Sequence, residues 1–191
     1  VMGVPLGVIS AIRQGSWTDL GVMLLALGGI SFPVFWVGLV GILIFSHEIP
    51  VFPALGATSS SSILKQVHHL ALPALVLGMS VAAYIARLTR SAMLEVLSQE
   101  YIRVAYAMGV PERRVVYRLA LRNALIPVLA VIGVTFAWSL GSAILVEAVF
   151  SRPGMGSMIL KAIFARDYQL VQAGVMVLAF AVVLINTSLD I

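Results

Sequence analysis

The chain has 191 residues, of which 61% are hydrophobic and only 10% are charged, and its formal net charge is +4. A soluble domain carries about 25% charged residues, so this composition excludes a water-covered globular surface and predicts an integral membrane protein. Cysteine is absent, which excludes disulfides and thiolate metal sites.

We expect the sequence to form one all-α, polytopic transmembrane helical bundle over residues 1–191. Each long apolar run is sufficient for a helix that crosses a hydrocarbon core of about 30 Å. The predicted elements are a partial span at 1–12, about four complete spans near 20–45, 68–87, 126–150 and 168–189, and a charged loop at 90–125. Because the sequence begins and ends in apolar runs, we expect it to be truncated at both ends.

The first complete span, residues 20–45, contains no charged side chain. Gly28, Gly29 and Pro33 are expected to weaken or kink this helix, which neighbouring helices can compensate in a membrane. The polar segment that follows, residues 46–66, includes a serine run at 59–62 and is expected to be an exposed loop.

The second complete span carries small residues at every fourth position. These residues are Ala74, Gly78, Ala82 and Ala86. They share one helix face and predict close helix packing in lipid. His68 and His69 stand at the start of this span; neighbouring residues on a helix face different ways, which favours interfacial capping over metal binding.

The stretch after this span holds most of the charge. Residues 86–123 contain seven arginines and three glutamates, a balance of +4 that equals the net charge of the whole chain. Basic residues accumulate on the cytoplasmic side of membrane proteins, so we expect this stretch and Arg13 to be cytoplasmic. The segments 46–66 and 151–167 are then expected on the opposite side.

Within the charged stretch the pattern predicts helix, tight turn, helix. Residues 99–108 are good helix formers and end at Gly109, the residue type that adopts the left-handed conformation after a helix. Pro111 is tolerated in the first turn of the next helix. Arg114, Arg118 and Arg122 then recur at intervals of four and share a face.

Such a basic element can dock on anionic lipid headgroups or on a soluble cytoplasmic protein, and the residues alone leave both open. Nucleic acid is disfavoured as a partner, because aromatic residues do not alternate with the basic ones and a soluble domain is missing.

The third complete span supplies candidate residues for a transport pathway or gate. Ser139 and Ser142 could line a pathway, although hydrogen bonds between helices are favoured for them. Glu147 lies near the outer end of the span, where a carboxylate is costly without a partner. We expect it to form a structural or gating ion pair, with Arg152 within reach.

The charged stretch resembles the cytoplasmic "EAA" coupling loop of ABC importer permeases, in particular the dipeptide/oligopeptide/nickel branch. The similarity is carried by YIRVAYAMG (101–109), ERR (112–114) and LRNALIP (121–127). Other segments similar to that branch are SFPVFWVG (31–38), ARLTRSAMLEV (86–96), VEAVFSRPGMG (146–156) and ARDY (165–168). The resemblance therefore extends over essentially the whole chain.

The match to the general loop pattern is partial. Ala105 and Gly109 correspond to its second alanine and its glycine. Arg103, Val104 and Arg122 stand where that pattern has glutamate, alanine and proline. A basic residue at the first position is usual in the peptide branch, so these departures favour that branch.

The resemblance implies a non-catalytic, multi-pass subunit of a bacterial or archaeal inner membrane. Its implied partners are a second permease subunit, two cytoplasmic ATPases and an extracytoplasmic solute-binding protein; its implied substrates are di- or oligopeptides. ATP and Mg²⁺ would bind to the ATPases, and this chain, which lacks a G-x-x-x-x-G-K-[ST] stretch, would hold no cofactor. Residues expected to contact the ATPase are Arg103, Ala105, Gly109, Glu112, Arg113 and Arg118.

Two other functions are weighed against this one. An intramembrane hydrolase would need a nucleophile and base pair or an H-E-x-x-H helix, and the three histidines cluster at one surface. An ATP-independent channel or secondary transporter is the stronger alternative, but it does not explain the basic insert.

Overall fold

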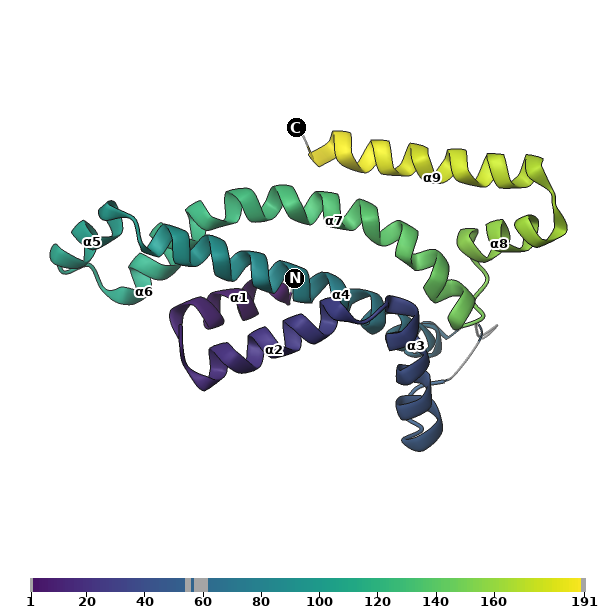
Figure 1. Cartoon of the computed structure of the whole chain (residues 1–191), viewed down its shortest axis with the longest axis horizontal. Coiled ribbons are helices and arrows are strands. Elements are labelled where there is room, and N and C mark those ends of the chain that lie inside the picture. The colour runs from purple at the N-terminus through teal and green to yellow at the C-terminus, as the bar shows by residue number, and fades with distance from the viewer. Residues whose placement is uncertain (1, 54–55, 57–61, 190–191) are drawn as a thin grey trace. The chain divides into compact units, whose positions relative to one another are not determined.

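The computed structural model describes residues 2–53, 56 and 62–189 (Figure 1). Asp190 and most of the predicted serine loop, residues 59–61, lie outside the described residues. The elements are α1 (Gly3–Ile12), α2 (Trp17–Ser31), α3 (Val34–Ile42), the π-helix η1 (Leu43–Glu48), α4 (Ile63–Leu97), α5 (Glu100–Ala107), α6 (Glu112–Arg114), the π-helix η2 (Val115–Ala120), α7 (Leu121–Val149), α8 (Met155–Ala165) and α9 (Tyr168–Leu189).

Three continuous helices are long and apolar enough to cross a membrane. They are Ile63–Leu97, Glu112–Val149 and Tyr168–Ser188, and α2 with α3 and η1 adds a fourth if that broken pair is one span. This arrangement confirms the predicted fold class, all-α and polytopic. The charged insert is shorter than the prediction, because α4 continues to Leu97 and the helix that includes α7 already begins at Glu112.

The first predicted complete span is interrupted at Pro33. Helix α2 ends at Ser31, and α3 begins after Pro33, which has extended backbone angles (φ −58°, ψ 137°). Proline disfavours helical conformation in the residue before it and has no amide hydrogen to donate. The break therefore falls at the proline rather than at the Gly28–Gly29 pair, which remains inside α2.

One compact unit consists of residues 2–31 and 80–134. In this unit α1 and α2 lie side by side (Figure 1). Its core is a continuous cluster of buried side chains from α1, the second half of α4, α5, η2 and the first half of α7. The cluster contains Val8, Ala11, Ile85, Ala92, Met93, Ile102, Ala105, Val115, Val116, Ala120, Ala124 and Val128.

Helix α1 approaches α4 through glycines. A Cβ atom on Gly3 would lie 2.6 Å from the carbonyl oxygen of Ala82, and one on Gly7 would lie 2.6 Å from Cβ of Thr89. A side chain at either glycine would collide with α4, so only glycine permits this separation. The predicted small-residue face of α4 is thus used by α1 at Ala82 and Ala86.

The other compact unit consists of residues 32–79 and 135–189 of the described chain. Its core is built from Leu72, Val76, Val146 and Phe150, with half-buried side chains of α3 against it. Gly38 of α3 faces the Phe150 ring, 3.3 Å from a Cβ at that glycine. Helices α8 and α9 pack together, with Gly174 against Ile159.

Candidate functional site

The candidate coupling element is α5, the turn after it, and α6 with η2. It follows directly on α4, since only Ser98 and Gln99 separate the two helices. The Ser98 hydroxyl donates to the Glu95 carbonyl oxygen at 2.7 Å, and Gln99 is extended (φ −69°, ψ 148°). The chain therefore leaves α4 and enters α5 through a short, hydrogen-bonded turn.

Helix α5 ends in a Schellman motif centred on Gly109. Gly109 has φ +76°, and its amide donates to the Tyr106 carbonyl at 3.0 Å. The Val110 amide donates to the Ala105 carbonyl at 3.1 Å, which completes the pair of bonds that defines this motif. The predicted left-handed glycine is confirmed, and its physical reason is the low cost of positive φ without a Cβ.

The second helix of the element begins at Pro111. Pro111 is the N-cap residue, with ψ 138°, and its carbonyl accepts the amides of Arg114 at 2.8 Å and Val115 at 3.2 Å. The helix then passes through the π-helix η2, where the hydrogen-bond spacing is wider than in an α-helix. Val115, Val116 and Ala120 of η2 face the core, and the arginines of this helix stay exposed.

The inner face of α5 is fixed to the core. Ile102 is fully buried and Ala105 is 9% exposed, and both belong to the cluster that includes Met93 and Val116. The Asn123 amide also donates to the Tyr101 hydroxyl at 2.8 Å, which joins α5 to α7. The element is therefore preformed and packed, rather than a free loop.

The predicted contact residues divide into two groups. Arg103, Gly109, Glu112, Arg113 and Arg118 are exposed, together with the apolar side chains of Val104, Tyr106 and Met108. In the part of the chain that the structure describes, none of the four charged residues in this set forms an ion pair. Ala105 lies on the opposite, buried face of α5, so its small side chain serves packing within the chain.

The candidate pathway residues lie on α7. The Ser139 hydroxyl donates to the Phe136 carbonyl of its own helix at 2.6 Å, and among the described residues it has no hydrogen bond to another helix. Ser142 is half-buried on the same helix. Their role in a pathway stays a prediction.

The expected ion pair between Glu147 and Arg152 is wrong. A Glu147 carboxylate oxygen accepts the Ser157 amide at 3.0 Å, in the first turn of α8. Arg152 instead donates to the carbonyl oxygens of His69 at 3.0 Å and Gly56 at 3.4 Å. The amides at a helix N-terminus lack partners within the helix and carry a positive dipole, so a carboxylate is stabilised there.

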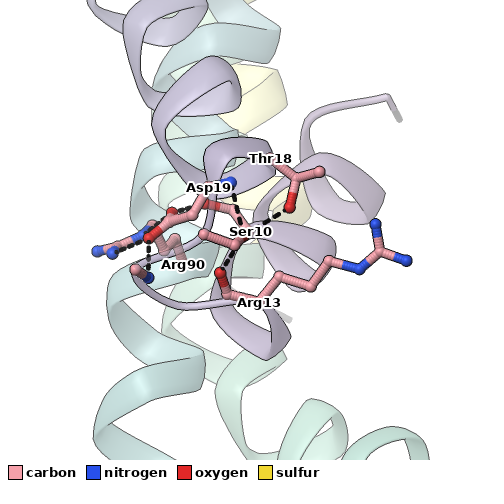
Figure 2. Close-up of polar contacts among 7 residues, drawn as sticks. Ser10, Arg13, Thr18, Asp19 and Arg90 are labelled. Atoms are coloured by element: carbon pink, nitrogen blue, oxygen red, sulfur yellow. Dashed lines mark hydrogen bonds and ion pairs between the residues drawn. The ribbon is translucent and has the colours of Figure 1, made fainter.

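A buried polar cluster around Asp19 was missed by the sequence reasoning. Figure 2 shows the Asp19 side chain, which is 5% exposed, surrounded by donors. Arg90 of α4 donates through Nε to Oδ1 and through Nη2 to Oδ2, both at 2.7 Å. The Gly15 amide donates to Oδ2 at 3.0 Å, and the fully buried Ser10 hydroxyl donates to Oδ1.

The sequence did hold one signal for this cluster. Asp19 is the only acidic residue before Glu48 and begins an apolar helix, and a carboxylate in such a place requires a partner. The partner is 71 residues away, and nothing in the local pattern identifies it. The contact places the turn between α1 and α2 beside the second half of α4, which agrees with the expectation that Arg13 and the charged stretch lie on the same side.

Several helices long and apolar enough to span a membrane, together with a packed helix-turn-helix whose basic side chains are exposed, define a polytopic membrane protein. The chain belongs to the family of binding-protein-dependent transport system inner membrane components, whose match covers residues 3–191.

Two relatives of this chain are named as permeases of peptide transport systems. The chain is 43% identical to the di/tripeptide transport system permease protein DppB of Pseudomonas aeruginosa, over 99% of this chain and 62% of that protein. It is 41% identical to the dipeptide transport system permease protein DppB of Alkalihalophilus pseudofirmus, over 100% of this chain and 64% of that protein. The chain thus spans less than two thirds of the length of these relatives.

Proposed function

We propose that this chain is the membrane-spanning permease subunit of an ATP-driven ABC importer that translocates di- or oligopeptides. The family supports a role in transport, and the names of the relatives support peptides as the substrate class. The single observation that carries the coupling role is the preformed α5 element, whose exposed charges have no ion-pair partners within the described chain.

In the proposed mechanism the ATPase subunits carry out the chemistry and the permease subunits change conformation. The permease is non-catalytic: two cytoplasmic ATPase subunits bind ATP and Mg²⁺, and an extracytoplasmic binding protein delivers the peptide to a pair of permease subunits. ATP binding shifts the equilibrium between two permease states because the ATPases contact α5 differently in each. The contact residues are Arg103, Gly109, Glu112, Arg113 and Arg118, with Met108 added because it is 77% exposed.

Site-specific crosslinking tests the docking face. The chain has no native cysteine, so single cysteines at the exposed Met108 and at the buried Ala105, one helical turn apart, are probes that differ in exposure. In the complex with its ATPases, we expect M108C to crosslink to an ATPase subunit and A105C, at the buried position, to react weakly. Strong crosslinking from position 105 with none from position 108 would contradict an ATPase contact through the exposed end of α5.

Uptake by the reconstituted complex tests the function itself. With the sister permease, the ATPases, the binding protein and a radiolabelled dipeptide, we expect vesicles to accumulate label only when ATP is supplied. Uptake that is unchanged without ATP or ATPases would instead identify a channel or secondary transporter.

A further inference from the structure

We propose that Asp19 and Arg90 are positioning residues that carry the movement of the coupling element to α2. The inference rests on the proposed function, because it requires α5 to be displaced by a partner. Asp19 and Arg90 are not among the exposed residues proposed to contact the ATPase. Neither peptide binding nor ATPase docking explains the buried polar cluster that they form.

Helix α2 packs against α1, but few of its residues are buried. Only Asp19, Ala26 and Gly29 are buried among its residues. Most of its large apolar side chains are exposed, among them Leu24 at 58% and Leu25 at 71%. An apolar helix with so little buried surface can slide or rotate in lipid, because lipid and protein solvate its side chains about equally.

The pair restrains α2 through geometry. Arg90 presents two parallel donors, both 2.7 Å from the two carboxylate oxygens, and such a fork fixes orientation as well as distance. Ser10 of α1 and Gly15 of the connecting turn donate to the same carboxylate. The carboxylate thus joins α1, the turn and α4 at the start of α2 (Figure 2).

Arg90 is in turn coupled to α5 by packing. Two and three residues after Arg90, Ala92 and Met93 are buried in the same cluster as Ile102 and Ala105 of α5. Only the short turn at Ser98 and Gln99 separates α4 from α5, so the two helices have little freedom to move independently. A displacement of α5 therefore moves the end of α4, and the Arg90 fork moves Asp19 with it.

Stability alone does not account for this pair. The Asp19 side chain is buried and the Arg90 side chain is 25% exposed, so the pair loses much of its hydration. Replacement of such a pair by apolar residues of similar size is often neutral or stabilising. The best-attested use of buried polar groups is to fix register between helices. A double apolar replacement can therefore separate positioning from folding.

The decisive variant is D19L/R90M in the complete permease, assembled with its ATPases, sister subunit and binding protein. We expect normal co-purification of the ATPases and continued ATP hydrolysis, with dipeptide transport per ATP reduced roughly tenfold, the scale of a typical coupling free energy. R90K keeps the charge but loses the fork, so it should show an intermediate reduction.

A spin label provides a readout that does not depend on transport. A nitroxide on a cysteine at Leu24 of α2 should become more mobile in D19L/R90M, while a label at the exposed Glu95 of α4 should be unchanged. Equal mobility at Leu24 in both proteins, or wild-type transport per ATP in D19L/R90M, would overturn the proposal. Failure of D19L/R90M to assemble would also overturn it, because the pair would then be needed for folding.

The wild-type complex separates this inference from the proposed function. Absence of ATP-dependent uptake by the wild type would refute the importer function, whatever the label at Leu24 shows. ATP-dependent uptake by the wild type together with unchanged coupling in D19L/R90M would refute only the role of the pair.

Discussion

The compact unit that contains α5 has two charged regions, and their arginines differ in exposure and in ion pairing. Around α5 and α6 the arginines are exposed and form no ion pairs within the described chain, whereas Arg90 holds Asp19 in a buried cluster. An exposed charge is well hydrated and available to a partner, while a buried one is costly unless it is paired. The exposed set therefore suits docking between subunits, and the buried set suits internal positioning.

The largest expected contrast is between Arg90 and Arg113. Arg90→Ala leaves the Asp19 carboxylate buried without its main partner and should destabilise the protein by about 3 kcal/mol, since unpaired buried charges are strongly destabilising. Arg113→Ala removes an exposed charge and should change stability by less than about 0.5 kcal/mol. Thermal unfolding in detergent measures both, and equal shifts would contradict the division into buried and exposed sets.

The next effect concerns the glycine that lets α1 reach the buried cluster. Gly7→Val would place a Cβ 2.6 Å from Cβ of Thr89, so α1 must move away from α4. Overpacking of this kind costs about 1–3 kcal/mol. Gly28→Val is the control, because a Cβ at Gly28 meets nothing within 4 Å. A Gly28 variant as unstable as the Gly7 variant would show that helix propensity, not the contact with α4, decides the result.

A smaller effect is expected at the turn of the candidate coupling element. Gly109→Ala should destabilise the turn by about 1–2 kcal/mol, because φ +76° brings a Cβ close to the following carbonyl. Gly109→Asn should be tolerated better, since asparagine visits this conformation more readily. Spin labels at Met108 would report the local loosening, and equal behaviour of the two variants would argue against backbone strain as the cause.

The smallest effect is expected at the exposed edge of α5. Tyr101→Phe removes one hydrogen bond to Asn123 and should cost about 0.5–1 kcal/mol or less, because water can replace an exposed partner. Asn123→Ala should give a similar value, and the double variant should add little. Independent, additive losses in a double-mutant cycle would show that the bond does not join α5 to α7.

From the sequence alone, composition and periodicity determined the membrane class, the all-α fold and the turn at Gly109. These properties depend on local rules: apolar length, and the freedom of glycine at positive φ. The same rules located the exposed arginines, since a run of basic residues between spans must face water. The exact position of the interruption could also have been predicted, because Pro33 was among the residues expected to kink the span.

The tertiary structure alone decided which of those residues are available and which are used internally. No local sequence pattern predicts that Ala105 is buried. It is buried because Ile102 and Met93 pack on the same side of α5. Glu147 caps α8 because the fold brings the Ser157 amide to it, ahead of the nearby Arg152. Asp19 meets Arg90 of α4 where α1 packs closely on α4 at Gly3 and Gly7, and such a pairing depends on packing between segments far apart in the chain.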